Sequence, residues 1–450
     1  MPTKPQSREL NASSVDILNA IRNNASQTYR NLVPRATDTN VREIGRILMG
    51  NPTFQNEFLS SLVNRIGMVL ITSKMYSNPW SIFKKGRMEY GETIEEIFVN
   101  IAKAHTYDMD IAEEQVFKRE IPDVVSVYHV LNYQKFYKAT IQEENLRQAF
   151  LSLDGVTDLI ARIVDSMYTG AEYDEFLVMK YMIAKHLLNG DLYPVTVPTA
   201  DATNAKAIAT TMKAISNQFQ FMSENYNASG VATHTERNKQ YLIVNAAFDA
   251  TMDMEVLASA FNMDKAEFMG HRVLVDSFGN LDKKRLNYLF ADDPNYVEIT
   301  DDQLKALDTI PGIIVDLDWF MIFDNMEKFT EIYNGQGLYW NYWYHVWKIF
   351  SVSPFANAVA LIPGTPSVTS VKVTPEAATT VPGGQVALMA QVETEHFAPQ
   401  AVTWSVDESK ATVNFNGVVT IKKGVSGTVT VTATSVFDPT KTANCTITVG

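Results

Sequence analysis

The chain has 450 residues, of which 46% are hydrophobic and 20% charged, and its formal net charge is −13. This length predicts two or more domains with ordinary globular composition. No apolar run approaches the roughly 18 residues of a membrane span, residues 1–11 hold no apolar signal core, and the single cysteine forms no internal disulfide. These features argue against a membrane or exported protein and favour a reducing cytoplasm. The acidic charge argues against a protein that grips nucleic acid.

The chain before about residue 66 is predicted to be polar and helical. Apolar residues recur at helical spacing between residues 41 and 48, and Asn51-Pro52 ends that helix. A second apolar run, between residues 58 and 66, continues as another helix.

A long hairpin is predicted for residues 67–104. A short apolar strand at 68–71 leads into a polar, basic tip at 78–92, from which the run TIEEIFVNIAK returns. The spacing within 94–101 fits both a strand and a helix, and the preceding strand favours the hairpin.

Two amphipathic helices and an α+β region follow. The helices cover 156–168 and 173–188, with Gly170 interrupting and Gly190 ending the second. Residues 191–335 alternate helical runs (202–222 and 256–269) with strands (241–247, 272–276 and 313–317).

The next segment is unusually aromatic. Seven of the twelve residues from Tyr339 to Phe350 are aromatic. Read as a strand, it places Trp340, Tyr342, Tyr344 and Val346 on one face and Trp343 and Trp347 on the other. Because both faces are apolar, the strand is expected to be buried on both sides or to meet other chains.

The last part, residues 368–450, reads as a β-sandwich dense in Val and Thr. Its predicted strands are 371–373, 386–392, 402–406, 418–421, 429–434 and 445–449. It resembles a group 2 bacterial immunoglobulin-like domain (Big2) through Pro375, Gly384, Trp404, Gly417 and the Val-Thr-Ala-Thr-Ser run at 431–435. Trp404 is the expected buried core aromatic. Residues 362–367 read as a linker.

Enzyme interpretations find little support. Asp316, Asp318 and Asp324 are candidate glycosidase carboxylates or metal ligands, but no His or Glu companion lies at ligand spacing. The sequence has no phosphate-binding loop, nucleophile elbow or paired-cysteine motif. Cys445 reads as a structural thiol. We expect no catalytic residue, cofactor or metal.

A second resemblance covers nearly the whole chain. The runs GLYWNYWYHVWKIFSVSPFANAVAL, FKKGRMEYGETIEEIF, VPRATDTNV and DLDWFMIFDN resemble the major head protein of phi-29-like podoviruses, a family that also carries a C-terminal Big2 domain. The resemblance implies the Hong Kong 97-like capsid fold. Residues 1–66 would be the N-terminal arm, 67–104 the extended loop, 105–363 the peripheral and axial domains (axial insert about 200–335), and 364–450 the Big2 domain.

The resemblance implies a non-enzymatic, self-assembling capsid protein. Copies would form pentamers and hexamers in an icosahedral or prolate virion shell around double-stranded DNA. Scaffolding protein and portal would take part in assembly in the host bacterial cytoplasm. The alternative is a cell-surface carbohydrate-binding protein or glycoside-active enzyme with an immunoglobulin-like accessory domain. The candidates for inter-subunit contact are Lys84, Lys85, Arg87, Trp343 and Trp347.

Overall fold

The computed structural model describes most of the chain. The described residues are 14–51, 53–55, 57–58, 61, 77–88, 93–106, 119–122, 124–144, 150, 165–253, 271–294 and 296–450. They form two compact units, each assembled from three separate stretches of sequence. The first unit comprises Met1–Ile94, His129–Val178 and Ile322–Phe350, and the second comprises Glu95–Tyr128, Met179–Met321 and Ser351–Gly450.

The first unit begins with three short helices, α1 (Ser14–Asn24), α2 (Gln27–Leu32) and α3 (Val41–Met49). Their apolar stripes meet in a small core that includes Ile21, Tyr29 and Leu48, all almost fully buried. The predicted helix at 41–48 is therefore confirmed. The predicted helix at 58–66 and strand at 68–71 fall almost entirely outside the described residues.

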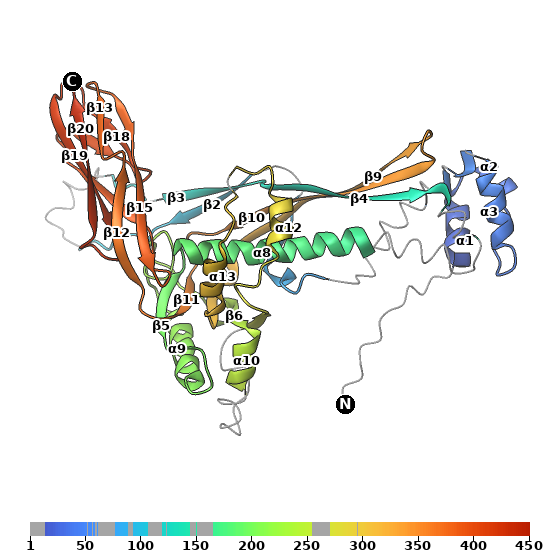
Figure 1. The fold of residues 1–450 in the computed structure, drawn as a ribbon, viewed down its shortest axis with the longest axis horizontal. Coiled ribbons are helices and arrows are strands. Elements are labelled where there is room, and N and C mark those ends of the chain that lie inside the picture. The colour runs from blue at the N-terminus through green and yellow to red at the C-terminus, as the bar shows by residue number, and fades with distance from the viewer. Residues whose placement is uncertain are drawn as a thin grey trace. The chain divides into compact units, whose positions relative to one another are not determined.

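A four-stranded sheet dominates the first unit. Its strand order is β1 (Lys84–Arg87), β9 (Phe320–Asn334), β10 (Tyr339–Val352) and β4 (Tyr133–Gln142). The long strands are drawn as extended ribbons in Figure 1. β10 pairs antiparallel with β4 from Tyr339 opposite Gln142 to Lys348 opposite Tyr133, so the aromatic segment is a central strand. Its period-2 pattern predicts this correctly.

The first strand predicted for the hairpin at 67–104, residues 68–71, lies outside the described residues, so the hairpin itself stays a prediction. β1, inside the expected tip, pairs parallel with β9, while β2 (Thr93–Val99) pairs with β3 (Val124–Val130). The strand assignment for 94–99 is confirmed. The pairing of β1 with β9 and of β2 with β3 was not predicted, because partners distant in sequence leave no mark on the local pattern.

The long helix α8 (Gly170–Asn189) directly follows a π-helical turn, η2 (Asp165–Thr169). Gly170 is therefore the first residue of α8, and the predicted interruption of the helical region at Gly170 is wrong. The predicted stop is confirmed: Gly190 has φ +69°, a left-handed conformation that glycine adopts without strain. The predicted helix at 156–168 lies mostly outside the described residues.

The second unit contains a five-stranded sheet. Its order is β5 (Tyr193–Val197), β11 (Ala358–Pro363), β8 (Gly312–Asp316), β6 (Gln240–Asn245) and β7 (His271–Val275). Helices α9 (Ala205–Gln218) and α10 (Ala246–Met252) share an apolar core with β5, β6, β8 and β11. Two shorter helices, α12 (Lys283–Leu289) and α13 (Asp301–Asp308), precede β8. The three strands predicted here are confirmed within two residues. The predicted helix at 256–269 lies entirely outside the described residues.

The C-terminal part of the second unit is an all-β sandwich. Its strands are β12 (Ser367–Thr374), β13 (Ala377–Thr380), β14 (Gln385–Ala387), β15 (Met389–Glu395), β16 (Val402–Val406), β17 (Ala411–Val413), β18 (Val418–Ile421), β19 (Gly427–Ser435) and β20 (Thr442–Val449). All six predicted strands are present, but the one at 386–392 divides at Leu388 between two sheets. Cys445 is a buried core thiol, as expected.

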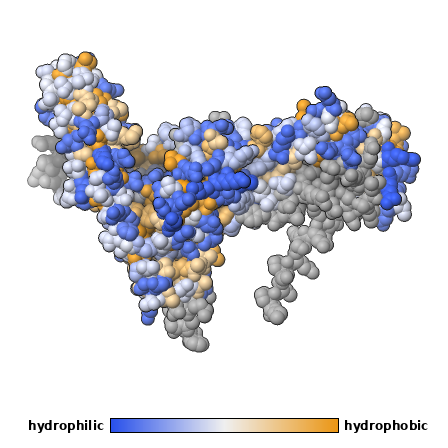
Figure 2. Space-filling model, viewed as in Figure 1, coloured by the Kyte–Doolittle hydropathy of each residue, from blue (hydrophilic) through white to orange (hydrophobic). Residues whose placement is uncertain are grey.

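Two details of the sandwich differ from expectation. Trp404 is only partly buried and packs at the margin of the core. The linker is shorter than predicted, because β11 ends at Pro363 and β12 begins at Ser367. On the face seen in Figure 2, polar and apolar residues are intermixed over the sandwich. The most exposed large apolar residue of the sandwich is Phe415, at 87%.

Gly417 is predicted to be irreplaceable in the sandwich. It has φ +76°, and an added Cβ would lie 2.4 Å from the carbonyl oxygen of Leu388 and 2.9 Å from Cζ2 of Trp404. Gly424 has a similar φ of +81° but open space around it. We expect Gly424→Ala to cost about 1–2 kcal/mol from backbone strain alone, and Gly417→Ala a further 1–3 kcal/mol from overpacking.

The measurement is denaturant unfolding of an isolated 365–450 fragment, which we expect to fold because it has its own core. Equal losses of unfolding free energy in Gly417→Ala and Gly424→Ala would contradict the predicted clash of the added Cβ at Gly417. An unfolded wild-type fragment would contradict the independence of the sandwich.

Candidate functional site

Four ionisable side chains meet in the first unit, one from each of four elements: Lys84 of β1, Glu175 of α8, Asp324 of β9 and Lys348 of β10. We call this set the ionic quartet. Lys84 Nζ lies 3.1 Å from Glu175 Oε2 and 2.7 Å from Asp324 Oδ2. Lys348 Nζ lies 2.9 Å from Asp324 Oδ1 and also contacts Glu175 Oε2. The side chains of Lys348 and Glu175 are only 4% and 1% exposed.

Further hydrogen bonds surround the quartet. The side-chain amide of Asn78 donates to Glu175 Oε1 at 2.7 Å, and the backbone N–H of Asn78 donates to Glu172 Oε2 at 2.8 Å. The hydroxyl of Tyr137 on β4 donates to Asp174 Oδ2 at 2.8 Å. Carboxylates from the first turns of α8 are thus bound both to the segment before β1 and to the sheet.

The charges in the quartet balance. Burial by itself would raise the pKa of Glu175 and of Asp324, but the ammonium groups of Lys348 and Lys84 outweigh it and hold both values below the ordinary range. Burial would likewise lower the pKa of Lys348, and the two carboxylates reverse that effect and raise it. All three groups therefore stay ionised near neutral pH, as buried charges do when they are paired.

The two faces of β10 have different surroundings. Tyr344 lies on the face that meets the helical layer, with its ring 6.5 Å from that of Tyr168. Trp343 and Trp347 lie on the opposite, outer face and are half-buried. On that face Lys138 Nζ sits 5.8 Å above the Trp343 ring, and Phe136 is 58% exposed. The predicted division of faces is confirmed, but only one face is fully buried.

The three predicted tip cations differ in their surroundings. Lys84 forms ion pairs within the ionic quartet, and its role in a subunit contact stays a prediction. Gly86, with φ +112°, accompanies a register shift in β1. Lys85 is half-buried and Arg87 is exposed, and their role in a subunit contact stays a prediction.

The β2–β3 pair has an apolar surface. Side chains that point to one side of these strands or lie just beyond their ends are more than half exposed: Ile97, Val99, Ile101, Ile121, Val124 and Tyr128. We call this surface the apolar ribbon. A two-stranded sheet is marginal by itself in water, and contiguous exposed apolar side chains mark interaction surfaces.

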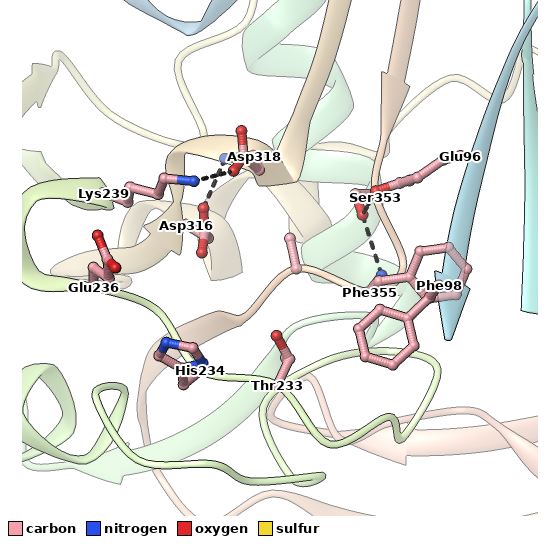
Figure 3. A pocket seen from close by; sticks show the side chains of 11 residues that line it. Glu96, Phe98, Thr233, His234, Glu236, Lys239, Asp316, Asp318, Ser353 and Phe355 are labelled. Atoms are coloured by element: carbon pink, nitrogen blue, oxygen red, sulfur yellow. Dashed lines mark hydrogen bonds and ion pairs between the residues drawn. The ribbon is translucent and has the colours of Figure 1, made fainter. Parts of the chain in front are cut away.

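The carboxylates weighed as an enzyme site do not come together. Asp324 belongs to the ionic quartet of the first unit, whereas Asp316 and Asp318 line a cavity in the second (Figure 3). Asp318 lies in the 3-10 turn η5 (Leu317–Trp319), after the end of β8. The Asp316 side chain caps that turn, accepting a hydrogen bond from the Asp318 N–H at 2.8 Å. Within the described ranges, no three His, Cys, Asp or Glu side chains are grouped to hold a metal.

None of the described helices is long and apolar enough to cross a membrane. The arrangement offers buried ion pairs and uncovered apolar surfaces. These are features of a protein that binds other copies or partners.

The fold is that of a phage capsid protein. The structure is similar to a chain in the capsid structure of Staphylococcus phage Andhra, with a TM-score of 0.50 and 17% identity, covering 64% of this chain and 85% of that one. This likeness, at low identity, concerns the fold, a Hong Kong 97-like architecture. The sandwich, residues 367–446, matches the bacterial Ig-like domain (group 2).

The family follows from sequence comparison. Residues 18–362 match the Phi29-like phage major capsid protein family. The chain is 39% identical to the major capsid protein of Bacillus phage B103, over 94% of this chain and 90% of that one, and 35% identical to that of Bacillus phage PZA, with the same coverage. The chain belongs to the family of Phi29-like phage major capsid proteins. Its function is that of the major capsid protein of a tailed phage.

Sequence reasoning missed the ionic quartet. Lys348 is a lone cation within the aromatic run, and Glu175 lies beside the apolar stripe of α8. Charged residues in apolar segments are rarely buried unless paired, so both positions indicated a buried ion pair. The partners were unpredictable because they come from four separate segments.

We predict that Glu175→Gln destabilises the first unit by about 3–5 kcal/mol, because the substitution leaves the buried Lys348 and the partly buried Lys84 with one carboxylate. Denaturant unfolding of the full chain measures this loss. The matched control is Glu43→Gln, at an exposed position in the same unit, which should change stability by less than about 0.5 kcal/mol. A Glu175→Gln loss as small as the control's would contradict the role of the quartet.

The pH dependence gives a second readout of the same prediction. The pKa values of Glu175 and Asp324 lie below their ordinary values of 4.5 and 3.8, so their contribution is present above those values and is lost as the pH falls through the folded-state pKa values. Wild-type stability should therefore fall more steeply below about pH 4 than that of Glu175→Gln.

Proposed function

We propose that copies of this chain form pentamers and hexamers that close into the DNA-containing head of a tailed phage, joined by contact between the apolar ribbon of one copy and the outer face of β10 in another. The observation that carries the proposal is the presence of two different uncovered apolar surfaces on one chain. Contact between two different surfaces is heterologous, and such contacts generate rings when the rotation closes.

The composition of the outer face supports a subunit contact. Tryptophan is among the residues that contribute most to binding at protein interfaces, and Trp343 and Trp347 are half-buried before any partner binds. Phe136 extends the same surface from β4, and Lys138 flanks Trp343. A half-buried indole loses little side-chain freedom on binding, so the cost of ordering this surface is low.

The charge supports a shell that encloses DNA without gripping it. Of the net −13, the sandwich from Gly364 onward accounts for −1, which leaves −12 for the preceding residues. Such a body repels phosphate. Scaffolding protein and portal are the partners we propose for assembly in the host cytoplasm, on the strength of family membership.

We predict that the double variant Trp343→Ala/Trp347→Ala remains soluble and folded but forms few shells. Their half-buried, outward position makes loss of contact the main effect. Each truncation should weaken the contact by about 2 kcal/mol, which is more than tenfold. Negative-stain microscopy and sedimentation measure shell yield. The control is Phe415→Ala, which removes an 87% exposed aromatic from the sandwich. Normal shells from the double variant would refute the proposed contact.

We also predict that a chain ending at Gly364 still assembles. The sandwich has its own core, and both apolar surfaces lie before residue 364. The truncated shells should keep wild-type heat resistance and differ in adsorption to host cells if the sandwich binds host surfaces. Truncated chains that fail to assemble, or shells that break at lower temperature, would instead assign the sandwich a role in stapling capsomers.

A further inference from the structure

A cavity of about 330 Å³ opens in the second unit, between the end of β8 and the segment after β10. Figure 3 shows Asp316 and Asp318 beside Lys239 on one side and Phe98 and Phe355 on the other. The two phenyl rings stack with centroids 5.5 Å apart and an interplanar angle of 26°. The cavity therefore combines an acidic wall with an aromatic wall.

The acidic wall has an excess of negative charge. Four carboxylates line the cavity, those of Glu96, Glu236, Asp316 and Asp318, against one ammonium, that of Lys239. Lys239 Nζ is bound to Asp318 at 3.1 Å. The side chain of Glu236 is exposed and has neither a hydrogen bond nor an ion pair within the described part of the chain.

Asp316 is the unusual member of this wall. It is only 7% exposed, yet it forms no ion pair with any described residue. The hydroxyl of Thr235 donates to its Oδ2 at 2.7 Å and the Asp318 N–H to its Oδ1, so only neutral donors satisfy it. Burial raises its pKa. Buried carboxylates are ordinarily paired with a cation, and this cavity leaves room for one.

We propose that the cavity binds an alkylammonium or alkylguanidinium group, with the cation against Asp316 and Glu236 and the methylene stem along the rings of Phe98 and Phe355. Long cationic side chains bury their stems against apolar surface, and cations are favourable near aromatic faces. The group has two possible sources: a free polyamine, or a lysine or arginine of a second copy. The second source rests on the proposed assembly.

Spermidine is the probe, titrated calorimetrically into the soluble full chain at about 0.15 M salt, where non-specific attraction is screened. We expect saturable binding at one site. Asp316→Asn should weaken it by about tenfold or more, the loss of one charge-assisted hydrogen bond. Glu236→Gln should weaken spermidine binding about two- to fivefold. This second variant tests the proposal even if Asp316→Asn does not fold. The control is Glu408→Gln, which removes the same charge from an exposed site in the sandwich.

Binding that is absent, or equal in the wild type and all three variants, would overturn the proposal. Assembled shells distinguish the two sources. If assembled shells still bind spermidine at this site, the cavity is free in the shell and the source is a free polyamine. If assembled shells no longer bind spermidine, and Asp316→Asn forms fewer shells, a side chain of a neighbouring copy fills the cavity. The soluble-chain titration does not depend on assembly, so its outcome is separate from that of the proposed function.

Discussion

The ionic quartet is the interaction on which the first unit depends. It joins α8 to three strands of the sheet, one of which, β1, is only four residues long. A strand of this length contributes few backbone hydrogen bonds, so the contacts of Lys84 with Glu175 and Asp324 are a large part of what holds it. Desolvating four charges is costly, and near-complete pairing offsets that cost. If β1 paired with β9 in another register, Lys84 would not reach Glu175 and Asp324, and charges would be left without partners. The quartet therefore constrains the register of β1 on β9.

The quartet also explains why the two faces of the sheet differ. Lys348 points to the α8 side, which is closed by charge pairs and by hydrogen bonds such as that of Tyr137 with Asp174. Neighbours of Lys348 in β10 point the other way because side chains alternate along a strand. The helix-facing side thus stabilises the fold, and Trp343 and Trp347 lie on the other side, where the proposed subunit contact would form. In the proposed assembly, folding and subunit contact use opposite faces of one strand.

Local patterns predicted much of this fold. Alternation in β10 indicated the correct faces, Gly190 marked the end of α8, and the sandwich strands followed from their turns. Strand pairing was not predictable in the same way. β1 pairs with β9, more than two hundred residues away, and nothing in the local sequence of either strand specifies that partner. The ionic quartet and the cavity at Asp316 are assembled by such distant pairings, so their residues looked isolated in sequence.

The positions of the carboxylates show why residue type alone misleads about function. Asp316 is buried and Asp324 is partly buried, and the two are close in sequence. Asp324 nevertheless pairs with two lysines, whereas Asp316 forms no ion pair with any described residue. Asp324 therefore has a role in stabilising the fold. Within the described part of the chain, Asp316 is bound only by the neutral donors of Thr235 and Asp318, and a partner that brings a cation would complete its pairing. In a protein whose function is assembly, the next copy is one source of that partner, and the cavity beside Asp316 is where its cation would bind.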